Sequence, residues 1–207
     1  ISQARWMQTN KHDYSKNSEG FCKKAVEYLG YPIFVKPANA GSSVGISKVR
    51  DYRELNAAIE SAFLNDSKIV LEEAIDGYEV ECAVLGNNEP VASTVGEIIP
   101  CNDFYDYEAK YISDGTKLLI PSHLPEEKRN EIRSEAIRAY KACGCTGLAR
   151  MDFFVRKNDG KVLFNEPNTL PGFTSISMYP KLFAAVGIEY SVLLDRLIQL
   201  AIERTDE

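Results

Sequence analysis

The segment that most constrains this chain is residues 163–174, LFNEPNTLPGFT, where a short apolar strand runs into polar residues and a turn. Glu166 and Asn168 lie two residues apart, and a Pro-Gly turn rich in hydroxyl groups follows. A carboxylate and an amide oxygen at this spacing suit a hard cation such as Mg2+, which prefers oxygen ligands and usually arrives with phosphates. The alternative is that both side chains only cap the turn at the end of a strand.

A second predicted strand, within residues 147–154, carries Arg150 and Asp152 two residues apart. These two side chains share one face of a strand, because successive side chains alternate between its faces. If the two strands are neighbours, Asp152, Glu166 and Asn168 surround a metal ion. Arg150 then lies beside that ion, and we expect the group to serve phosphoryl chemistry.

Composition excludes several classes of protein. The chain has 207 residues, which is enough to bury a core in one large domain or two small ones. Its net charge is -6 and no cluster of Lys and Arg stands out, so we do not expect a nucleic-acid partner. No apolar run approaches the roughly 18 residues of a membrane span, and no signal peptide is visible, so we expect no membrane association.

The cysteines and histidines limit the possible chemistry further. The five cysteines lack a CxxC pair, and Cys143 and Cys145 form the only close pair. We interpret that pair as a helix end and a turn rather than as a zinc or redox site. Reduced thiols indicate the cytoplasm. His12 and His123 are the only histidines, which leaves little material for a zinc site or a Ser-His-Asp triad.

Periodicity predicts helices and strands that alternate in two blocks, with a boundary at residues 74–77. Ser18 and Asp51 are the predicted N-caps of the first two helices, and Asp51 forms a capping box with Glu54. A cleft between the two blocks would be the natural ligand site. The predicted helices cover residues 18–29, 51–65, 125–142 and 190–204, the last with Leu193, Leu194, Leu197, Ile198 and Ala201 on one apolar face. Strands are predicted at residues 31–36, 68–73, 79–85 and 90–98, in addition to the two that carry the candidate metal ligands.

Two loops are candidates for nucleotide binding. Residues 36–45 place Lys36 at a strand end before a Gly-Ser loop, whose small residues allow backbone N–H groups to approach phosphate oxygens. A plain turn is the alternative, and the pattern is not that of a P-loop. Residues 100–117 are polar and aromatic, and their apolar residues follow neither the helical nor the strand spacing. We interpret them as a lid over a nucleotide, the alternative being a small core beneath a loop.

Five motifs together resemble the ATP-grasp part of the D-alanine–D-alanine ligase family. They are KPxxxGSSxG, LEExIxGxEV, FYDYEAKY, GLARxD and NExNTxPGFTSxSxYP, and they follow the family's order and spacing over nearly the whole chain. The resemblance implies an α+β fold with two α+β subdomains and ATP bound between them. Residues 1–76 would form the central (lid) subdomain and residues 77–207 the C-terminal subdomain with the active-site loop 100–117. The family's N-terminal domain is missing, so we expect a fragment of a longer protein that is inactive alone.

The resemblance also implies roles for individual residues. ATP would be bound by Lys36, Ser42, Ser43, Glu72, Glu73, Ala74, Ile75, Glu79, Phe104 and Lys110. Two Mg2+ or Mn2+ ions would be held by Asp152, Glu166 and Asn168, with Glu166 bridging. The catalytic residues would be Arg150, Ser42, Tyr111 and Gly172. Among these, Arg150 and the Gly172 N–H would stabilise the negatively charged oxygen that forms during the reaction. The substrate pocket would include Tyr111, Arg150, Gly172, Ser177 and Met178.

The implied reaction joins two D-alanines through an acyl phosphate, for peptidoglycan synthesis in the cytoplasm. Resistance-type relatives that use D-lactate or D-serine tend to carry Arg where this chain has Met178, so D-alanine is favoured as second substrate and D-serine remains an alternative. The chain could also be a different ATP-grasp carboxylate–amine ligase, or a nucleotide-binding module without turnover. The resemblance allows a homodimer of the full-length protein.

Overall fold

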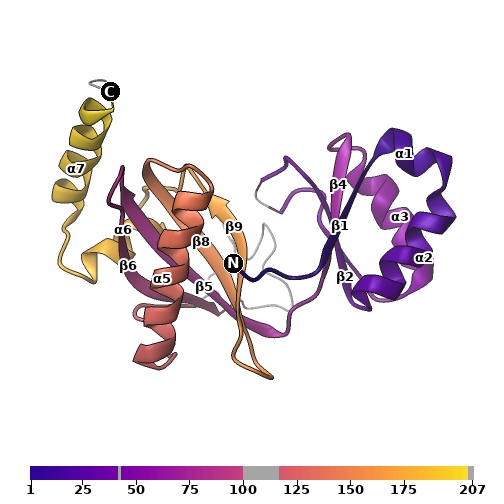
Figure 1. The fold of residues 1–207 in the computed structure, drawn as a ribbon, viewed down its shortest axis with the longest axis horizontal. Helices are drawn as coiled ribbons and strands as arrows, with labels where there is room; N and C mark the ends of the chain where they lie inside the picture. Colours follow the sequence, from indigo (N-terminus) through magenta and orange to yellow (C-terminus); the bar gives the residue numbers. More distant parts are fainter. Residues whose placement is uncertain (42, 100–116, 205–207) are drawn as a thin grey trace. The chain divides into compact units, whose positions relative to one another are not determined.

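The structure is a computed structural model that describes residues 1–41, 43–99 and 117–204. These residues form two compact units (Figure 1). The N-terminal unit comprises residues 4–75, and the C-terminal unit comprises residues 1–3, 76–99 and 117–204. Within the described ranges, no helix has the length and apolar character needed to cross a membrane.

The N-terminal unit contains a four-stranded antiparallel sheet with helices packed against it. The strand order is β1 (Trp6–Asn10), β4 (Lys68–Glu73), β2 (Ile33–Pro37) and β3 (Ser47–Val49). The helices are α1 (Lys11–Lys16), α2 (Ser18–Leu29) and α3 (Tyr52–Ala62). Side chains of β2 alternate between buried and half-buried, so Ile33 and Val35 enter the core with Leu55 and Ile59 of α3. Lys36 therefore lies on the other face of β2.

The helix starts show one prediction that is confirmed and one that is wrong. Asp51 caps α3, because its carboxylate accepts the N–H groups of Arg53 and Glu54. The carboxylate of Glu54 accepts the N–H of Arg50 at 2.9 Å, one residue before the cap. Asn17 caps α2, not Ser18, and its side chain accepts the N–H of Gly20 at 3.0 Å. Both residue types can cap a helix, so the backbone turn at Asn17 decides which one does.

The C-terminal unit contains a five-stranded antiparallel sheet. The strand order is β7 (Lys117–Leu119), β6 (Val91–Ile99), β5 (Gly77–Gly86), β8 (Gly147–Arg156) and β9 (Val162–Asn168). The helices are α5 (Glu126–Ala142), α6 (Met178–Ala184) and α7 (Tyr190–Glu203). Lys117 belongs to β7, so the aperiodic segment that was predicted to reach residue 117 ends earlier.

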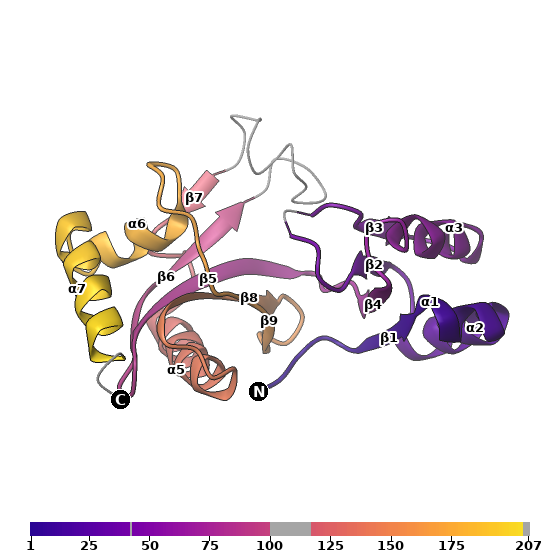
Figure 2. The same cartoon turned by 90° about the horizontal axis from the view of Figure 1, so that it is seen from above.

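Opposite faces of this sheet carry α5 and α6 (Figure 2). Val80, Val95 and Met151 pack in one core with Ile132 and Tyr140 of α5. Gly96, next to Val95 in β6, points the other way, because side chains alternate along a strand. A Cβ built at Gly96 would lie 2.8 Å from Leu182 Cδ2 and 3.0 Å from Met178 Sδ of α6. Glycine at this position therefore allows α6 to pack closely on the face opposite α5.

The last helix lies where it was expected, and its apolar side chains differ in burial. Leu193 is fully buried, but Leu194 is 37% exposed and Ile198 is 57% exposed. The helix is confirmed, but burial is uneven along its apolar face: Leu193 is buried, Leu197 is half-buried and Ile198 is exposed. The predicted helix end and turn at these cysteines are confirmed: Cys143 ends α5, and Gly144 adopts φ +64° in the turn that follows.

Candidate active site

Five polar residues line up on the face of the C-terminal sheet opposite α5. Glu81 on β5 lies opposite Asp152 on β8, and Asp152 lies opposite Glu166 on β9. In the adjacent row, Arg150 lies opposite Asn168. Ala149, Met151 and Phe153 alternate with Arg150 and Asp152 along β8 and pack into the α5 core. The sheet thus brings together Arg150 and the three predicted metal ligands.

A β-bulge gives Glu166 its place in this row. Phe153 pairs with Phe164, and the next pair along the strands is Asp152 with Glu166, so Asn165 is the extra residue of β9. Phe164 is buried against α5, and in a regular strand Glu166 would point to the same side as Phe164. A bulge inserts one residue and re-aims the side chains that follow it. Here it turns Glu166 toward the face that carries Asp152.

Arg150 is held by two carboxylates. Its Nε donates to Asp152 Oδ1 and its Nη2 donates to Asp152 Oδ2, both at 2.7 Å. Glu81 Oε2 lies 3.1 Å from the same Nε. Burial alone would lower the pKa of the Arg150 guanidinium, but the charges of Asp152, Glu81 and Glu166 raise that pKa above its usual value. The guanidinium is therefore a fixed positive charge on a largely buried surface.

The loop after β9 is organised around Ser177. Its Oγ accepts the N–H of Thr174 at 3.0 Å and lies 2.9 Å from Thr174 Oγ1. A Cβ on Gly172 would come within 2.7 Å of the same Oγ, so a larger residue there would displace the Ser177 hydroxyl. Met178 differs from these residues, since its side chain is 5% exposed and packs toward Gly96. Gly172 and Ser177 are thus brought together, while Met178 lies mainly in the core.

Several predicted ATP-binding residues lie in the N-terminal unit. Lys36 Nζ on β2 forms an ion pair with Glu72 Oε2 on β4 at 2.8 Å. In the Gly-Ser loop, Val44 N–H donates to Gly41 O, and Ser43 adopts φ +61°. Ser43 is the one non-glycine residue with positive φ in the described part of the chain. A left-handed backbone at this position belongs to a tight turn rather than to a continued strand.

The strand end that was predicted to meet the adenine is held by Arg5. Glu73 Oε1 accepts the Arg5 backbone N–H and Glu73 Oε2 accepts Arg5 Nε, both at 2.8 Å. The two Nη groups of Arg5 donate to the carbonyls of Tyr28 and Leu29 at the end of α2. Ala74 N–H donates to Pro32 O at 3.0 Å. These bonds fix the chain as it leaves β4 toward Ile75.

The remaining predicted residues divide into two groups. Glu79 lies on β5 and shares the face of Glu81, two residues further along the strand. The other group lies outside the described residues: Ser42, Phe104, Lys110 and Tyr111.

The polar side chains on this sheet face offer oxygen atoms as ligands for a metal ion. Outside residues 42, 100–116 and 205–207, the structure contains no group of three or more His, Cys, Asp or Glu side chains arranged to hold a metal. The predicted set has two carboxylates, on Asp152 and Glu166, and its third ligand is the amide of Asn168. An oxygen-only set with two negative charges fits Mg2+, which binds a few carboxylates and keeps its other positions for water and phosphate.

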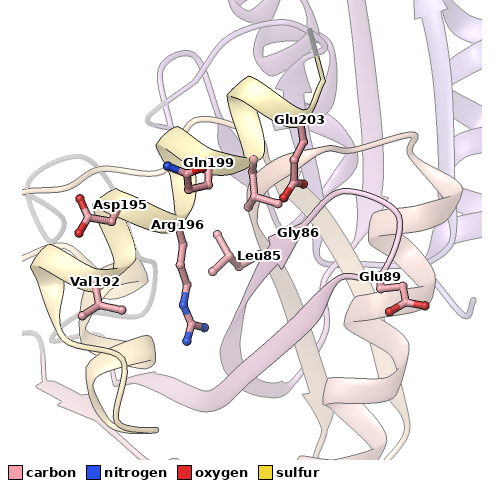
Figure 3. A pocket seen from close by; sticks show the side chains of 9 residues that line it. Leu85, Gly86, Glu89, Val192, Asp195, Arg196, Gln199 and Glu203 are labelled. Carbon is pink, nitrogen blue, oxygen red and sulfur yellow. The ribbon is translucent and has the colours of Figure 1, made fainter. Parts of the chain in front are cut away.

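A cavity of about 350 Å3 lies elsewhere on the C-terminal unit, between α7 and the end of β5 (Figure 3). Leu85 and Gly86 line one side, and Arg196, Asp195 and Glu203 project from α7. None of the predicted ATP, metal or substrate residues lines this cavity. Its walls carry charges of both signs, so they select no ligand class.

Sequence reasoning missed two residues that organise the candidate site. Glu81 is the one charged residue among residues 80–85 of β5, and a charge inside a buried strand was the available signal. Arg5 gave no comparable signal, because its partners Glu73, Tyr28 and Leu29 are far from it in the sequence.

The comparisons with known proteins agree on one family. The family described as "D-ala D-ala ligase C-terminus" matches residues 1–199. A D-alanine--D-alanine ligase of Acetivibrio thermocellus is 54% identical over 207 residues, which cover 100% of this chain and 55% of that protein. One of Ruminiclostridium cellulolyticum is 58% identical over 181 residues, or 86% of this chain and 48% of that protein. The chain thus spans about half the length of these curated relatives.

Solved structures give the same result. The VanG D-Ala:D-Ser ligase from Enterococcus faecalis has a TM-score of 0.86 and 42% identity, and the match covers 97% of this chain and 57% of that one. The D-alanine-D-alanine ligase from Coxiella burnetii has a TM-score of 0.85 and 39% identity, with 99% and 53% covered. The predicted fold class is confirmed: the chain has the α+β fold of the ATP-grasp class. It belongs to the D-alanine–D-alanine ligase C-terminus family.

Proposed function

We propose that this chain is the part of an ATP-dependent D-alanine–D-alanine ligase that binds ATP, its metal ions and the second amino acid. The observation that carries the proposal is the pairing of Arg150 with Asp152 directly across the sheet from Asn168 and Glu166. The arrangement combines a fixed cation with oxygen ligands on one sheet face. Both features suit a reaction in which negative charge develops on transferred phosphate and on an acyl oxygen.

The roles of the site residues form part of this proposal. Lys36 would bind ATP phosphates, the backbone at Glu73, Ala74 and Ile75 would meet the adenine edge, and Glu72 and Glu79 would accept hydrogen bonds from its amino group or the ribose. Asp152, Glu166 and Asn168 would hold two Mg2+ ions, which supply positive charge next to the phosphate oxygens when bound. The Gly172 N–H and Arg150 would stabilise the oxyanion. Ser43, Ser177 and Met178 would shape the phosphate loop and the amino-acid pocket, together with Ser42, Phe104, Lys110 and Tyr111.

Two covalent steps make up the reaction. A carboxylate oxygen of the first D-alanine attacks the γ-phosphorus of ATP, the bond to the bridging oxygen of ADP breaks, and an acyl phosphate forms. The amine of the second D-alanine then attacks the acyl carbon. The C–O bond to phosphate breaks, and the proton lost by the amine nitrogen leaves with the released phosphate. Arg150 stabilises the tetrahedral oxyanion because its charge is fixed by Asp152 before the reaction begins.

A D-alanine–D-serine ligase is the second candidate function. The VanG D-Ala:D-Ser ligase is as similar in fold as the D-alanine-D-alanine ligase of Coxiella burnetii. The apolar character of Met178, next to Ser177 in the chain, favours D-alanine as the second substrate. We also infer a cytoplasmic location, where ATP is supplied, and a role in forming the peptide precursor of peptidoglycan.

The test is an assay of the complete protein that carries this sequence, with ATP, Mg2+ and D-alanine. We expect release of ADP that depends on both Mg2+ and D-alanine, with D-alanyl-D-alanine detected by chromatography. Arg150→Lys should abolish dipeptide formation, because Lys lacks the planar fork that pairs with Asp152. Arg138→Lys on α5 is the matched control. Release of ADP without D-alanine dependence would contradict the proposal, and a preference for D-serine would select the second candidate.

A further inference from the structure

Glu81 is a buried carboxylate for which the proposed reaction has no direct use. It lies on β5, is 5% exposed, and faces Asp152 across the β5–β8 ladder. Burying a carboxylate is costly unless a positive charge and hydrogen bonds compensate for the lost water. The compensating charge is Arg150, whose Nε lies 3.1 Å from Glu81 Oε2.

Asp152 and Glu81 both lie close to one N–H group of Arg150. The Nε atom of arginine carries a single hydrogen, and in this structure Nε donates to Asp152 Oδ1 at 2.7 Å. Glu81 Oε2 is only slightly farther away, at 3.1 Å. A small rotation of the Arg150 side chain would therefore be enough to transfer the Nε hydrogen bond from Asp152 to Glu81.

Asp152 has a second proposed task that conflicts with this hydrogen bonding. Both of its oxygens accept from Arg150, and the proposed function also requires Asp152 to bind a divalent cation. A carboxylate oxygen that binds a cation is a weaker acceptor for a guanidinium. Without another acceptor, the hydrogen bonds that position Arg150 would weaken when Asp152 binds the cation, which is when Arg150 has to stabilise the oxyanion.

We propose that Glu81 is a positioning residue that keeps the guanidinium of Arg150 in place when Asp152 binds the metal ion. The inference rests on the proposed roles of Arg150 and Asp152. Glu81 itself touches neither substrate nor metal in this account. It acts through Nε, which leaves the two Nη1 hydrogens of Arg150 available to the oxyanion.

Glu97 provides a matched comparison within the same sheet. It is 3% exposed on β6, so its burial is like that of Glu81. Its carboxylate instead contacts the ring of His123 and accepts the His123 N–H at 3.2 Å. Glu97→Gln therefore removes a buried charge from the sheet without removing a partner of Arg150.

The first measurement follows the Arg150 Nε–H by NMR in the isotope-labelled complete protein, where the signal is identified by its loss in Arg150→Lys. In the wild type and in Glu97→Gln, we expect exchange of this proton with water to stay slow after addition of Mg2+ and a non-hydrolysable ATP analogue. In Glu81→Gln we expect slow exchange without these ligands. Addition of the ligands should then accelerate exchange roughly tenfold or more, because a neutral amide is a weaker acceptor.

The second measurement separates positioning from a merely structural role. Glu81→Gln should lower kcat for dipeptide formation roughly ten- to hundredfold, the scale of a misplaced catalytic group, while the KM for ATP changes less than about twofold. Glu97→Gln should retain the wild-type kcat. If Glu81→Gln does not fold, Glu81→Asp keeps the charge but shortens its reach, and the same loss of kcat is expected with only a modest change in thermal stability.

The outcomes are distinguishable from those of the proposed function. If the wild type shows no D-alanine-dependent release of ADP, the proposed function fails, and the NMR comparison still decides whether Glu81 holds Arg150. If exchange of the Arg150 Nε–H in ligand-bound Glu81→Gln is as slow as in the wild type, the positioning role is wrong. An equal loss of kcat in Glu97→Gln would also overturn it, because any buried charge in the sheet would then have the same effect.

Discussion

Lys36 and Glu72 form an ion pair on adjacent strands of the N-terminal unit, with 2.8 Å between Nζ and Oε2. Lys36 projects from β2 on the face away from the helices, and Glu72 projects from the end of β4. Each side chain is 23% exposed. Both residues are proposed contacts of ATP, so a phosphate that binds Lys36 competes with Glu72 for the ammonium group. The pair holds Lys36 in one orientation.

Replacing Lys36 by Met should weaken binding of an ATP analogue roughly tenfold or more, because a charge-assisted bond to phosphate is lost. The unfolding free energy should fall by about 1–3 kcal/mol, because the mostly buried carboxylate of Glu72 loses Lys36 as its partner. Titration calorimetry and urea unfolding measure the two effects. Lys48→Met on β3 is the control, since Lys48 lies over the ring of Phe34 and has no proposed role. Equal binding by Lys36→Met and Lys48→Met would contradict the assignment.

Glu166→Gln should abolish ligation and leave the fold intact. Glu166 is exposed on β9, so the amide fits the same space, but it lacks the charge that two divalent ions require. Turnover at saturating Mg2+ and the thermal midpoint are the measurements. Glu127→Gln, on the exposed first turn of α5, should behave like the wild type in both. Turnover by Glu166→Gln near the wild-type rate would remove Glu166 from the metal site.

Gly45→Ala should destabilise the N-terminal unit. Gly45 adopts φ +74°, and an added Cβ would lie 2.7 Å from Asn65 Nδ2 and 2.9 Å from Pro37 Cγ. The left-handed backbone alone costs an L-residue about 1–2 kcal/mol. Gly41→Ala is the matched control in the same loop, because nothing lies within 4 Å of its Cβ position. Urea unfolding compares the two variants, and equal stability would show that the loop relaxes around the new side chain.

The turn between β8 and β9 should contribute stability that depends on pH. The side chain of Arg156 and then the N–H of Lys161 bind the Asp159 carboxylate and lower the pKa of Asp159 from 3.8 to about 2. Because the pKa is lower in the folded chain, the contribution is present above about pH 4 and is lost as the pH falls toward about 2. The difference in unfolding free energy between wild type and Asp159→Asn should shrink over that range. An unchanged difference would show that the charge of Asp159 does not contribute.

Much of the local structure follows from the sequence, because it depends on neighbours in the chain. The 3.6-residue period and the Asp51 cap predict α3, and the period of two in β8 places Arg150 and Asp152 on one face. The same kind of reasoning assigned α2 to the wrong cap, since Asn17 and Ser18 are adjacent residues that can both cap. It placed the apolar side chains of α7 on one face but not which of them are buried, because periodicity does not reveal which side of a helix contacts the rest of the protein.

The candidate site depends on strand pairing that no local pattern specifies. In a regular strand Glu166 would share the buried side of Phe164, and only the bulge at Asn165 brings it to the face of Asp152. The partners of Arg150 and Arg5 were likewise decided by tertiary structure, because Glu81 and Glu73 are about seventy residues away in the sequence. The sequence alone determined which chemical groups the chain carries and the family it resembles. The register between distant strands decided which of those groups meet, because a shift of one residue moves every side chain of a strand to its other face.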